Sequence, residues 1–165
     1  MELVFYPNEL LKTECKPVEK FDDVLANFVI DMTLVMYAER GVGIAAPQLG
    51  ATINVILVDP TGGEKSDTMK VMVNPKLLWS SKEMVRLSEG CLSAPGVVVT
   101  LERPEWIEVE YQTIRGERVV ERMGGWSARI VQHEMDHLMG KMMFDRVSSS
   151  SKKLMLRFYP HWKKR

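Results

Sequence analysis

The chain has 165 residues, 45% of them hydrophobic, which suits a single domain with a substantial core. Its 22 basic residues balance 22 acidic ones, so no overall field draws the protein to DNA or to an anionic membrane. Two cysteines, Cys15 and Cys91, exclude a framework of several disulfides and favour a reducing compartment.

The first third of the chain predicts one amphipathic helix. Apolar residues recur at helical spacing over residues 21–39, with Asp22 and Asp23 in the first turn. The glycines that follow end the helix and begin the segment GVGIAAPQ, residues 41–48, which is small and apolar up to Gln48. A lone Gly-x-Gly suggests a phosphate loop only weakly, and the Gly-Lys-Ser/Thr ending of such loops is missing here.

The middle of the chain predicts short strands. Residues 53–58 form a compact apolar run before a turn cluster, and residues 106–111 alternate apolar with charged side chains. Further strands are predicted at 71–73, ending before Asn74, and at 97–101 and 117–123. We therefore expect an α+β fold in which short, mostly antiparallel strands surround an N-terminal helix and a central, metal-binding helix.

The segment QHEMDH, residues 132–137, predicts that metal-binding helix. His133 and His137 are four residues apart, so a helix places both imidazoles on one face with Glu134 beside them. Ser127 is the expected N-cap, and Gly140 offers a stop. The alternative is that both histidines are ordinary polar residues of a surface helix.

A catalytic metal usually needs three protein ligands and an open position for water, so the third ligand decides the class of enzyme. Metalloproteases that extend this motif to a third histidine would need it at position 143, which is methionine, and no glutamate follows His137. Four candidates remain: Asp145, His161, Cys15 and Cys91. Cys91 lies in EGCLS, residues 89–93, where the preceding glycine allows close approach and a thiolate is a strong ligand.

Three segments, GVGIAAPQ, EGCLS and QHEMDH, in this order and spacing, resemble the three motifs of peptide deformylases. The resemblance extends from about Tyr6 to Arg146. It implies a metal-dependent hydrolase that removes the formyl group from the N-terminal formyl-methionine of newly made peptides and releases formate. It also implies one catalytic domain, residues 1–147, and a short basic C-terminal tail, residues 148–165.

The resemblance also assigns roles within the site. Glu134 takes the proton of a water and delivers it to the leaving amine, while the Gln48 amide and the Leu92 backbone N–H stabilise the charge on the formyl oxygen. Glu89 and Arg103 resemble a supporting ion pair, worth under about 1 kcal/mol if exposed. The family commonly uses Fe²⁺, which Zn²⁺, Ni²⁺ or Co²⁺ can replace. Three residues are implied as metal ligands: Cys91, His133 and His137.

The same resemblance places the peptide substrate beside the metal. The backbones of Val42, Gly43 and Gly90 resemble the edge along which substrates pair as an added strand. Trp126 departs from the leucine common in the family, which predicts an altered preference for the first side chain. The lining of the methionine slot, with His133 at its base, is implied to be Val42, Leu87, Trp126, Arg129 and Ile130.

Three other interpretations fit parts of the sequence. A zinc endopeptidase would use the same helix motif, but both of its usual third ligands are missing. An inactive relative that only binds peptides would have no need for a complete set of site residues. A structural zinc module would need a fourth good ligand.

The C-terminal residues predict a solvated tail. Residues 147–151 form a polar run interpreted as flexible, and from Lys141 to the end eight Lys and Arg accompany one acidic residue. The alternative is a functional basic tail that contacts the ribosome weakly, although Pro160 interrupts the segment where the family often has a longer helix. With no targeting pattern or membrane-spanning run, we expect a cytoplasmic monomer, encoded by a bacterium or a bacteriophage. A processed organellar form fits equally well.

Overall fold

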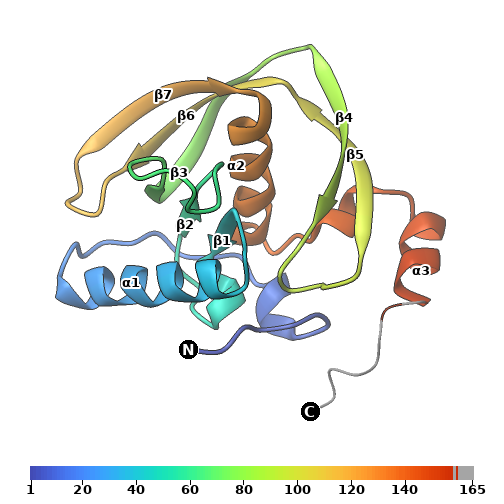
Figure 1. Ribbon diagram of the computed structural model, residues 1–165, viewed down its shortest axis with the longest axis horizontal. Helices are drawn as coiled ribbons and strands as arrows, with labels where there is room; N and C mark the ends of the chain where they lie inside the picture. Colours follow the sequence, from blue (N-terminus) through green and yellow to red (C-terminus); the bar gives the residue numbers. More distant parts are fainter. Residues whose placement is uncertain (158, 160–165) are drawn as a thin grey trace.

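A computed structural model describes residues 1–157 and residue 159, and it confirms an α+β fold. Five strands form an antiparallel sheet in the order β1-β2-β3-β6-β7, and two more form a separate ribbon, β4-β5 (Figure 1). The α-helices are α1 (Asp23–Ala38), α2 (Gly125–Leu138) and α3 (Ser149–Arg157). The strands are β1 (Gly43–Ala45), β2 (Val55–Val58), β3 (Lys70–Ser80), β4 (Met84–Gly90), β5 (Val98–Pro104), β6 (Trp106–Gln112) and β7 (Arg118–Gly124).

Strand β2 lies between the two long helices. Successive side chains of a strand point to opposite faces, so Val55 and Leu57 pack with α1 while Ile56 and Val58 pack with α2. All four residues are buried. This explains why the sequence shows a continuous apolar run here instead of an alternation.

Helix α1 confirms the amphipathic helix predicted over residues 21–39. The Asp22 side chain caps it by accepting a hydrogen bond of 3.1 Å from the Leu25 backbone N–H. Its inward face covers one side of the sheet through four buried residues: Leu25, Val29, Met32 and Met36.

The sequence predicted that strand β3 ends before Asn74. That prediction is wrong, because β3 continues to Ser80. Asn74 has a φ of 51°, and the pairing of β3 with β6 shifts register between Val73 and Lys76. The Asn74 side chain bonds both backbone groups of Val18, at 2.7 and 2.9 Å, and so holds this irregular position. The Asn-Pro pair therefore marks a bulge inside a long strand.

Helix α2 begins three residues earlier than the sequence predicted, so Ser127 is not its N-cap. The N-cap is Gly124, the last residue of β7, and Gly125 has a φ of 60°. The chain therefore turns from strand β7 into helix α2 at Gly124 and Gly125. The Gly125 N–H donates to the Glu105 carbonyl at 3.1 Å. The helix ends at Leu138, and the stop predicted at Gly140 is borne out by its φ of 69°.

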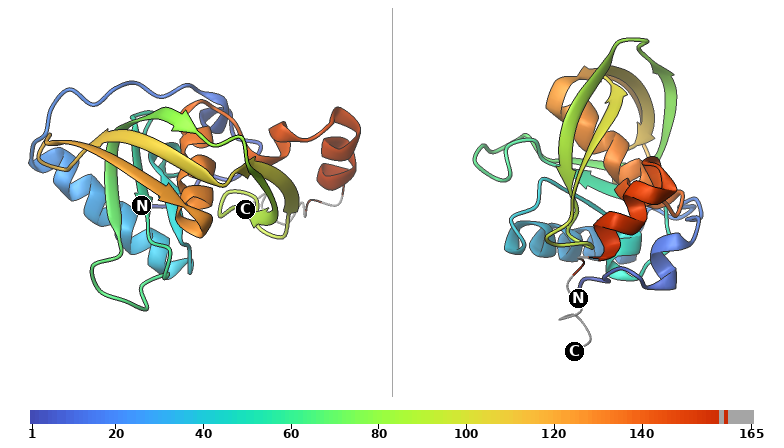
Figure 2. Two further views of the ribbon diagram at one scale, coloured as in Figure 1. Left: turned by 90° about the horizontal axis from the view of Figure 1, so that it is seen from above. Right: turned by 90° about the vertical axis from the view of Figure 1, so that its right-hand side faces the viewer.

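Residues 149–157 form helix α3, so the run interpreted as flexible is partly helical. The Ser148 hydroxyl accepts a hydrogen bond of 3.2 Å from the Ser151 backbone N–H, as a capping serine does. Helix α3 lies beside the β4-β5 ribbon (Figure 2). His161 and Pro160 lie outside the described residues. Within the described part of the chain, no helix is both long and apolar enough to cross a membrane.

Candidate metal centre

Helix α2 and the end of the ribbon bring three potential metal ligands together. Cys91, directly after β4, has its sulfur 3.3 Å from Nε2 of His137. His133 lies one helical turn before His137, and the ligand atoms of all three residues lie within 4.8 Å of one another. Of the third-ligand candidates within the described residues, Cys91 lies in this cluster, whereas Cys15 is in the core and Asp145 is outside the cluster.

This geometry fits a single divalent ion. Zn²⁺ binds cysteine at about 2.3 Å and histidine at about 2.0–2.1 Å, so one sulfur and two nitrogen ligands in a tetrahedral site stand roughly 3.3–3.6 Å apart. Burial and the neighbouring His133 lower the pKa of His137 well below its usual value, which keeps this imidazole in the neutral, ligating form. Three ligands of this kind leave the fourth position open, as catalytic sites do.

Glu134 follows His133 in α2, and one oxygen of its carboxylate is unpaired within the described part of the chain. Its side chain is 5% exposed, and Oε2 has no hydrogen-bond partner within the described residues. Burial raises its pKa to about 7. A Cβ at Gly43 would come within 2.6 Å of Oε1 of Glu134, so β1 can pass this carboxylate only with glycine at that position.

Gln48 is buried at the other side of the cluster. Its Oε1 accepts a hydrogen bond of 2.8 Å from the Ala45 backbone N–H, which fixes the orientation of the amide. Its Nε2 then points at the Ser93 hydroxyl, 3.1 Å away, and at the Cys91 sulfur, 3.7 Å away. The amide N–H₂ group is therefore held toward the metal ligands.

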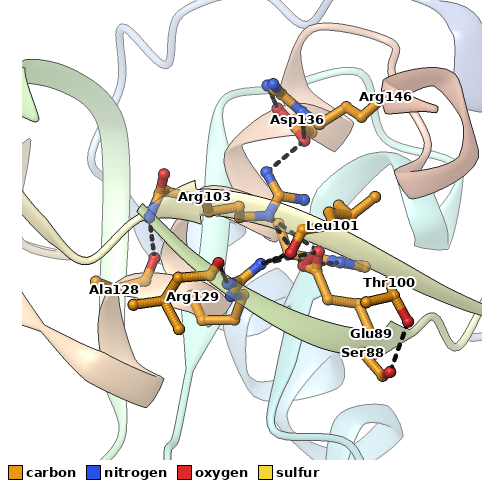
Figure 3. A network of polar contacts seen from close by, with 12 residues as sticks. Ser88, Glu89, Thr100, Leu101, Arg103, Ala128, Arg129, Asp136 and Arg146 are labelled. Atoms are coloured by element: carbon orange, nitrogen blue, oxygen red, sulfur yellow. Dashed lines mark hydrogen bonds and ion pairs between the residues drawn. The ribbon is translucent and has the colours of Figure 1, made fainter. Parts of the chain in front are cut away.

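His133 is supported by Glu89, the first residue of a chain of ion pairs that continues through Arg103 and Asp136 to Arg146. Figure 3 shows the chain from Glu89 to Arg146. Oε1 of Glu89 lies 3.3 Å from Nδ1 of His133, and both Glu89 oxygens lie 3.0 Å from Nε of Arg103. Arg103 also reaches Asp136 at 2.9 Å, and Asp136 binds Arg146. Burial would raise the pKa of Glu89, but the bonds from His133 and Arg103 outweigh it and lower that pKa.

The Glu89 and Arg103 side chains are both 3% exposed. The stabilisation of under about 1 kcal/mol expected for an exposed ion pair therefore does not apply to them. Removing one partner of a buried pair typically costs about 3–5 kcal/mol because the other charge is left unpaired. The pair is therefore part of the internal framework of the site.

One pocket of about 330 Å³ opens over the cluster. Trp126 stands at its wall and is 46% exposed, while the Arg129 guanidinium is turned away to the Leu101 and Val85 carbonyls. Leu87 is not among the lining residues, and its side chain is 41% exposed. The residues implied by sequence that do line the pocket are Val42, Gly43, Gln48, Gly90, Cys91, Leu92, Trp126, Arg129, Ile130, His133 and Glu134.

Sequence reasoning missed four residues of the site. Ser93 was inside the EGCLS motif and Asp136 inside QHEMDH, so their positions were visible although their contacts were not. Arg146 follows the motifs by several residues and carries no spacing signal. Arg40 lines the pocket from the segment just before GVGIAAPQ.

Comparisons with known proteins agree on one family. The model of the polypeptide deformylase family matches residues 1–153. Peptide deformylase of Rickettsia akari is 34% identical over 162 residues, covering 95% of this chain and 93% of that protein. Chloroplastic peptide deformylase 1B of Oryza sativa is 36% identical over 148 residues, or 90% of this chain. This chain spans only 55% of that rice protein and 54% of the related Arabidopsis thaliana one.

Solved structures give the same answer for the fold. The crystal structure of a peptide deformylase from Legionella pneumophila superposes with a TM-score of 0.89 at 35% identity, covering 94% of this chain and 90% of that one. The structure from Thermotoga maritima gives a TM-score of 0.84 at 37% identity, covering 89% of this chain and 97% of that one. The chain belongs to the polypeptide deformylase family.

Proposed function

We propose that this protein hydrolyses the N-terminal formyl group of formyl-methionyl peptides and releases formate. The observation that carries the proposal is that Cys91, His133 and His137 form one cluster, and that Cys91, His133 and the neighbouring Glu134 line a pocket above it. Membership of the deformylase family supports the same substrate class.

The chemistry divides between the metal and the protein. Cys91, His133 and His137 would hold a divalent cation, which would supply a lowered pKa to the attacking water, from about 16 toward 7. Glu134 accepts the proton of that water and passes it to the amine that leaves, a role supported by its unpartnered Oε2 and its pKa of about 7. Glu134 returns to its carboxylate form once formate and the free amine have been produced.

Gln48 and Leu92 stabilise the oxygen of the formyl carbonyl as negative charge develops on it. The orientation of Gln48, fixed through Ala45, supports this role because a preorganised donor loses no energy in reorienting during the reaction. The Leu92 backbone N–H is the second donor, and Leu92 lines the same pocket.

The peptide binds along the backbones of Val42, Gly43 and Gly90, with its methionine side chain in the slot. Val42, Ile130 and Trp126 supply apolar walls for that side chain. Arg129 contributes its aliphatic stem, since its guanidinium is bonded to backbone carbonyls. Leu87, which is exposed and outside the lining, is left out of this slot.

Fe²⁺ is the metal we propose for the native enzyme, with Zn²⁺, Ni²⁺ or Co²⁺ as substitutes. The cysteine and histidine ligands suit all four ions. An oxidisable ion beside a thiolate predicts that activity is lost in air and is protected by a reductant or by replacement with Ni²⁺. Elemental analysis of protein purified without oxygen identifies the ion directly.

We further propose a cytoplasmic monomer that acts on nascent peptides and binds neither DNA nor a membrane. Balanced charge and two unbridged cysteines support this assignment. We retain the division into a catalytic domain, residues 1–147, and a tail, residues 148–165, as a proposal. Lys153 and Arg157 on α3 supply the positive charge for a weak ribosome contact, since Lys152 is paired with Asp145.

The test is formate release from formyl-Met-Ala-Ser by protein loaded with Fe²⁺ or Ni²⁺ without oxygen. Wild-type protein is expected to release formate, and Glu134→Ala is expected to bind the metal but release none. Unformylated Met-Ala-Ser and an unformylated protein are the controls. No formate from a fully metallated wild type, or cleavage of internal peptide bonds, would contradict the proposal.

A further inference from the structure

Arg40 occupies a backbone conformation that suits glycine better. It follows the C-terminus of α1 with a φ of 56°. The Gly41 N–H donates to the Met36 carbonyl at 2.8 Å, and the Arg40 N–H donates to the Tyr37 carbonyl at 3.0 Å. This is the pattern of a Schellman motif, whose left-handed residue is usually glycine because a Cβ strains that conformation.

The arginine side chain stands at the mouth of the active-site pocket. Arg40 is exposed, lines the pocket, and forms no ion pair within the described residues. The other charged residues of the lining, Glu89, Arg129 and Glu134, are each at most 5% exposed. Arg40 is thus the exposed charge that this pocket presents to an incoming substrate.

The position of Arg40 along the chain indicates which part of the substrate it meets. Gly43 lies against Glu134, and Arg40 precedes Gly43 by three residues, a span of at most about 10 Å. A peptide whose formyl group is at Glu134 must leave through the pocket mouth. Since an extended peptide advances about 3.3 Å per residue, its second and third residues pass near Arg40.

We propose that Arg40 is a specificity-determining residue, which favours formyl-methionyl peptides carrying a carboxylate at the second or third residue. The inference rests on the proposed deformylase function and names the substrate class of the same site. Strained backbone positions cluster at functional sites, and this one carries a charged side chain into the pocket lining. Here glycine would relieve the strain but would remove the cation.

The experiment compares matched peptides that differ by one charge. Formyl-Met-Asp-Ser and formyl-Met-Ala-Asp, both with amidated C-termini, are set against the same peptides with Asn in place of Asp. The wild type is expected to show a kcat/KM about three to five times higher for the Asp peptides at low salt, as an exposed ion pair allows. High salt is expected to abolish the difference.

Variants assign the preference to the charge of residue 40. Arg40→Gln is expected to bring the Asp-to-Asn ratio of kcat/KM to about one, and Arg40→Lys is expected to keep most of the preference. Arg40→Gly is expected to lose the preference and to unfold at a higher temperature. Asp67→Gly is the matched control, because Asp67 is exposed with a φ of 70° and lies outside the pocket lining.

Each outcome bears on one proposal. Equal kcat/KM for Asp and Asn peptides in the wild type, or a preference that persists in Arg40→Gln, would overturn the role of Arg40. The role of Arg40 would also be overturned if Asp67→Gly changed the Asp-to-Asn ratio of kcat/KM as much as Arg40→Gly does. Formate from none of the peptides, with the metal bound, would instead overturn the deformylase function.

Discussion

Glu89 connects Arg103 to His133, with both of its oxygens 3.0 Å from Arg103 Nε and one of them 3.3 Å from His133 Nδ1. A ligating histidine is usually oriented by such a partner on its second nitrogen. Figure 3 shows that Arg103 is itself held between Glu89 and Asp136. The position of the His133 ring therefore depends on a chain of charges that extends from Glu89 through Arg103 to Asp136.

This arrangement predicts that Glu89→Gln weakens metal retention. The amide keeps the shape of the side chain but removes the charge that pairs with Arg103 and orients His133. Loss of such a partner typically costs about 10–100-fold in metal affinity or activity. The measurement is the rate at which a chelator removes the metal. The control is Glu102→Gln, which alters an exposed residue of β5 and should lose its metal at the wild-type rate. Equal rates of metal loss for all three proteins would contradict the prediction.

Gln48→Ala is predicted to lower kcat by about 10²–10³ while the metal stays bound, since one donor to the developing oxyanion is lost. The readouts are formate release at saturating substrate and metal content of the same preparation. A variant that loses only metal, with normal kcat per bound ion, would show that Gln48 acts through Cys91 and not on the substrate.

Trp126→Leu is predicted to change the preference for the first side chain by roughly tenfold, because the pocket wall loses several carbon atoms. Relative kcat/KM values for formyl-Met, formyl-norleucyl and formyl-Phe peptides measure the change. Trp106→Leu is a matched control, because Trp106 is 45% exposed and outside the pocket lining, against 46% for Trp126. Ordinary methionine selectivity, unchanged in Trp126→Leu, would count against the prediction.

Gly140→Ala is predicted to destabilise the fold by about 2–4 kcal/mol, as backbone strain and overpacking combine. Its Cβ would lie 2.4 Å from the Lys12 carbonyl oxygen, and its φ is 69°. Gly50→Ala isolates the strain, because Gly50 has a φ of 84° and nothing within 4 Å of an added Cβ. Urea denaturation should show a much smaller loss for Gly50→Ala; equal losses would mean that the Lys12 contact is unimportant.

Much of the fold was predictable because its hydrophobic periods are regular. Helix α1 has an apolar stripe at helical spacing, and β6 alternates between buried and more exposed residues. Strand β4 escaped prediction because its one buried residue is the charged Glu89, while its apolar residues Met84 and Leu87 are exposed. The bulge at Asn74 also escaped, since it depends on contacts with the distant Val18 backbone.

The site was predictable to the extent that its residues cluster in short motifs. His133 and His137 share a helix face, so their spacing alone brings them together. Cys91 lies 46 positions from His137, and only the resemblance to a family indicated that the two would meet. The contact between Asp136 and Arg146 had no signal of this kind, because the two residues lie in different elements and share no motif.

The proposed mechanism requires Cys91, His133 and His137 to hold the ion on which deformylation depends. The most direct test measures metal content and formate release together in Cys91→Ala and in Cys15→Ala, where the altered cysteine is in the core and away from the site. Cys91→Ala is predicted to lose both metal and activity, while Cys15→Ala keeps both in proportion to its folded fraction. A Cys91→Ala protein with full metal content and wild-type formate release would contradict the account.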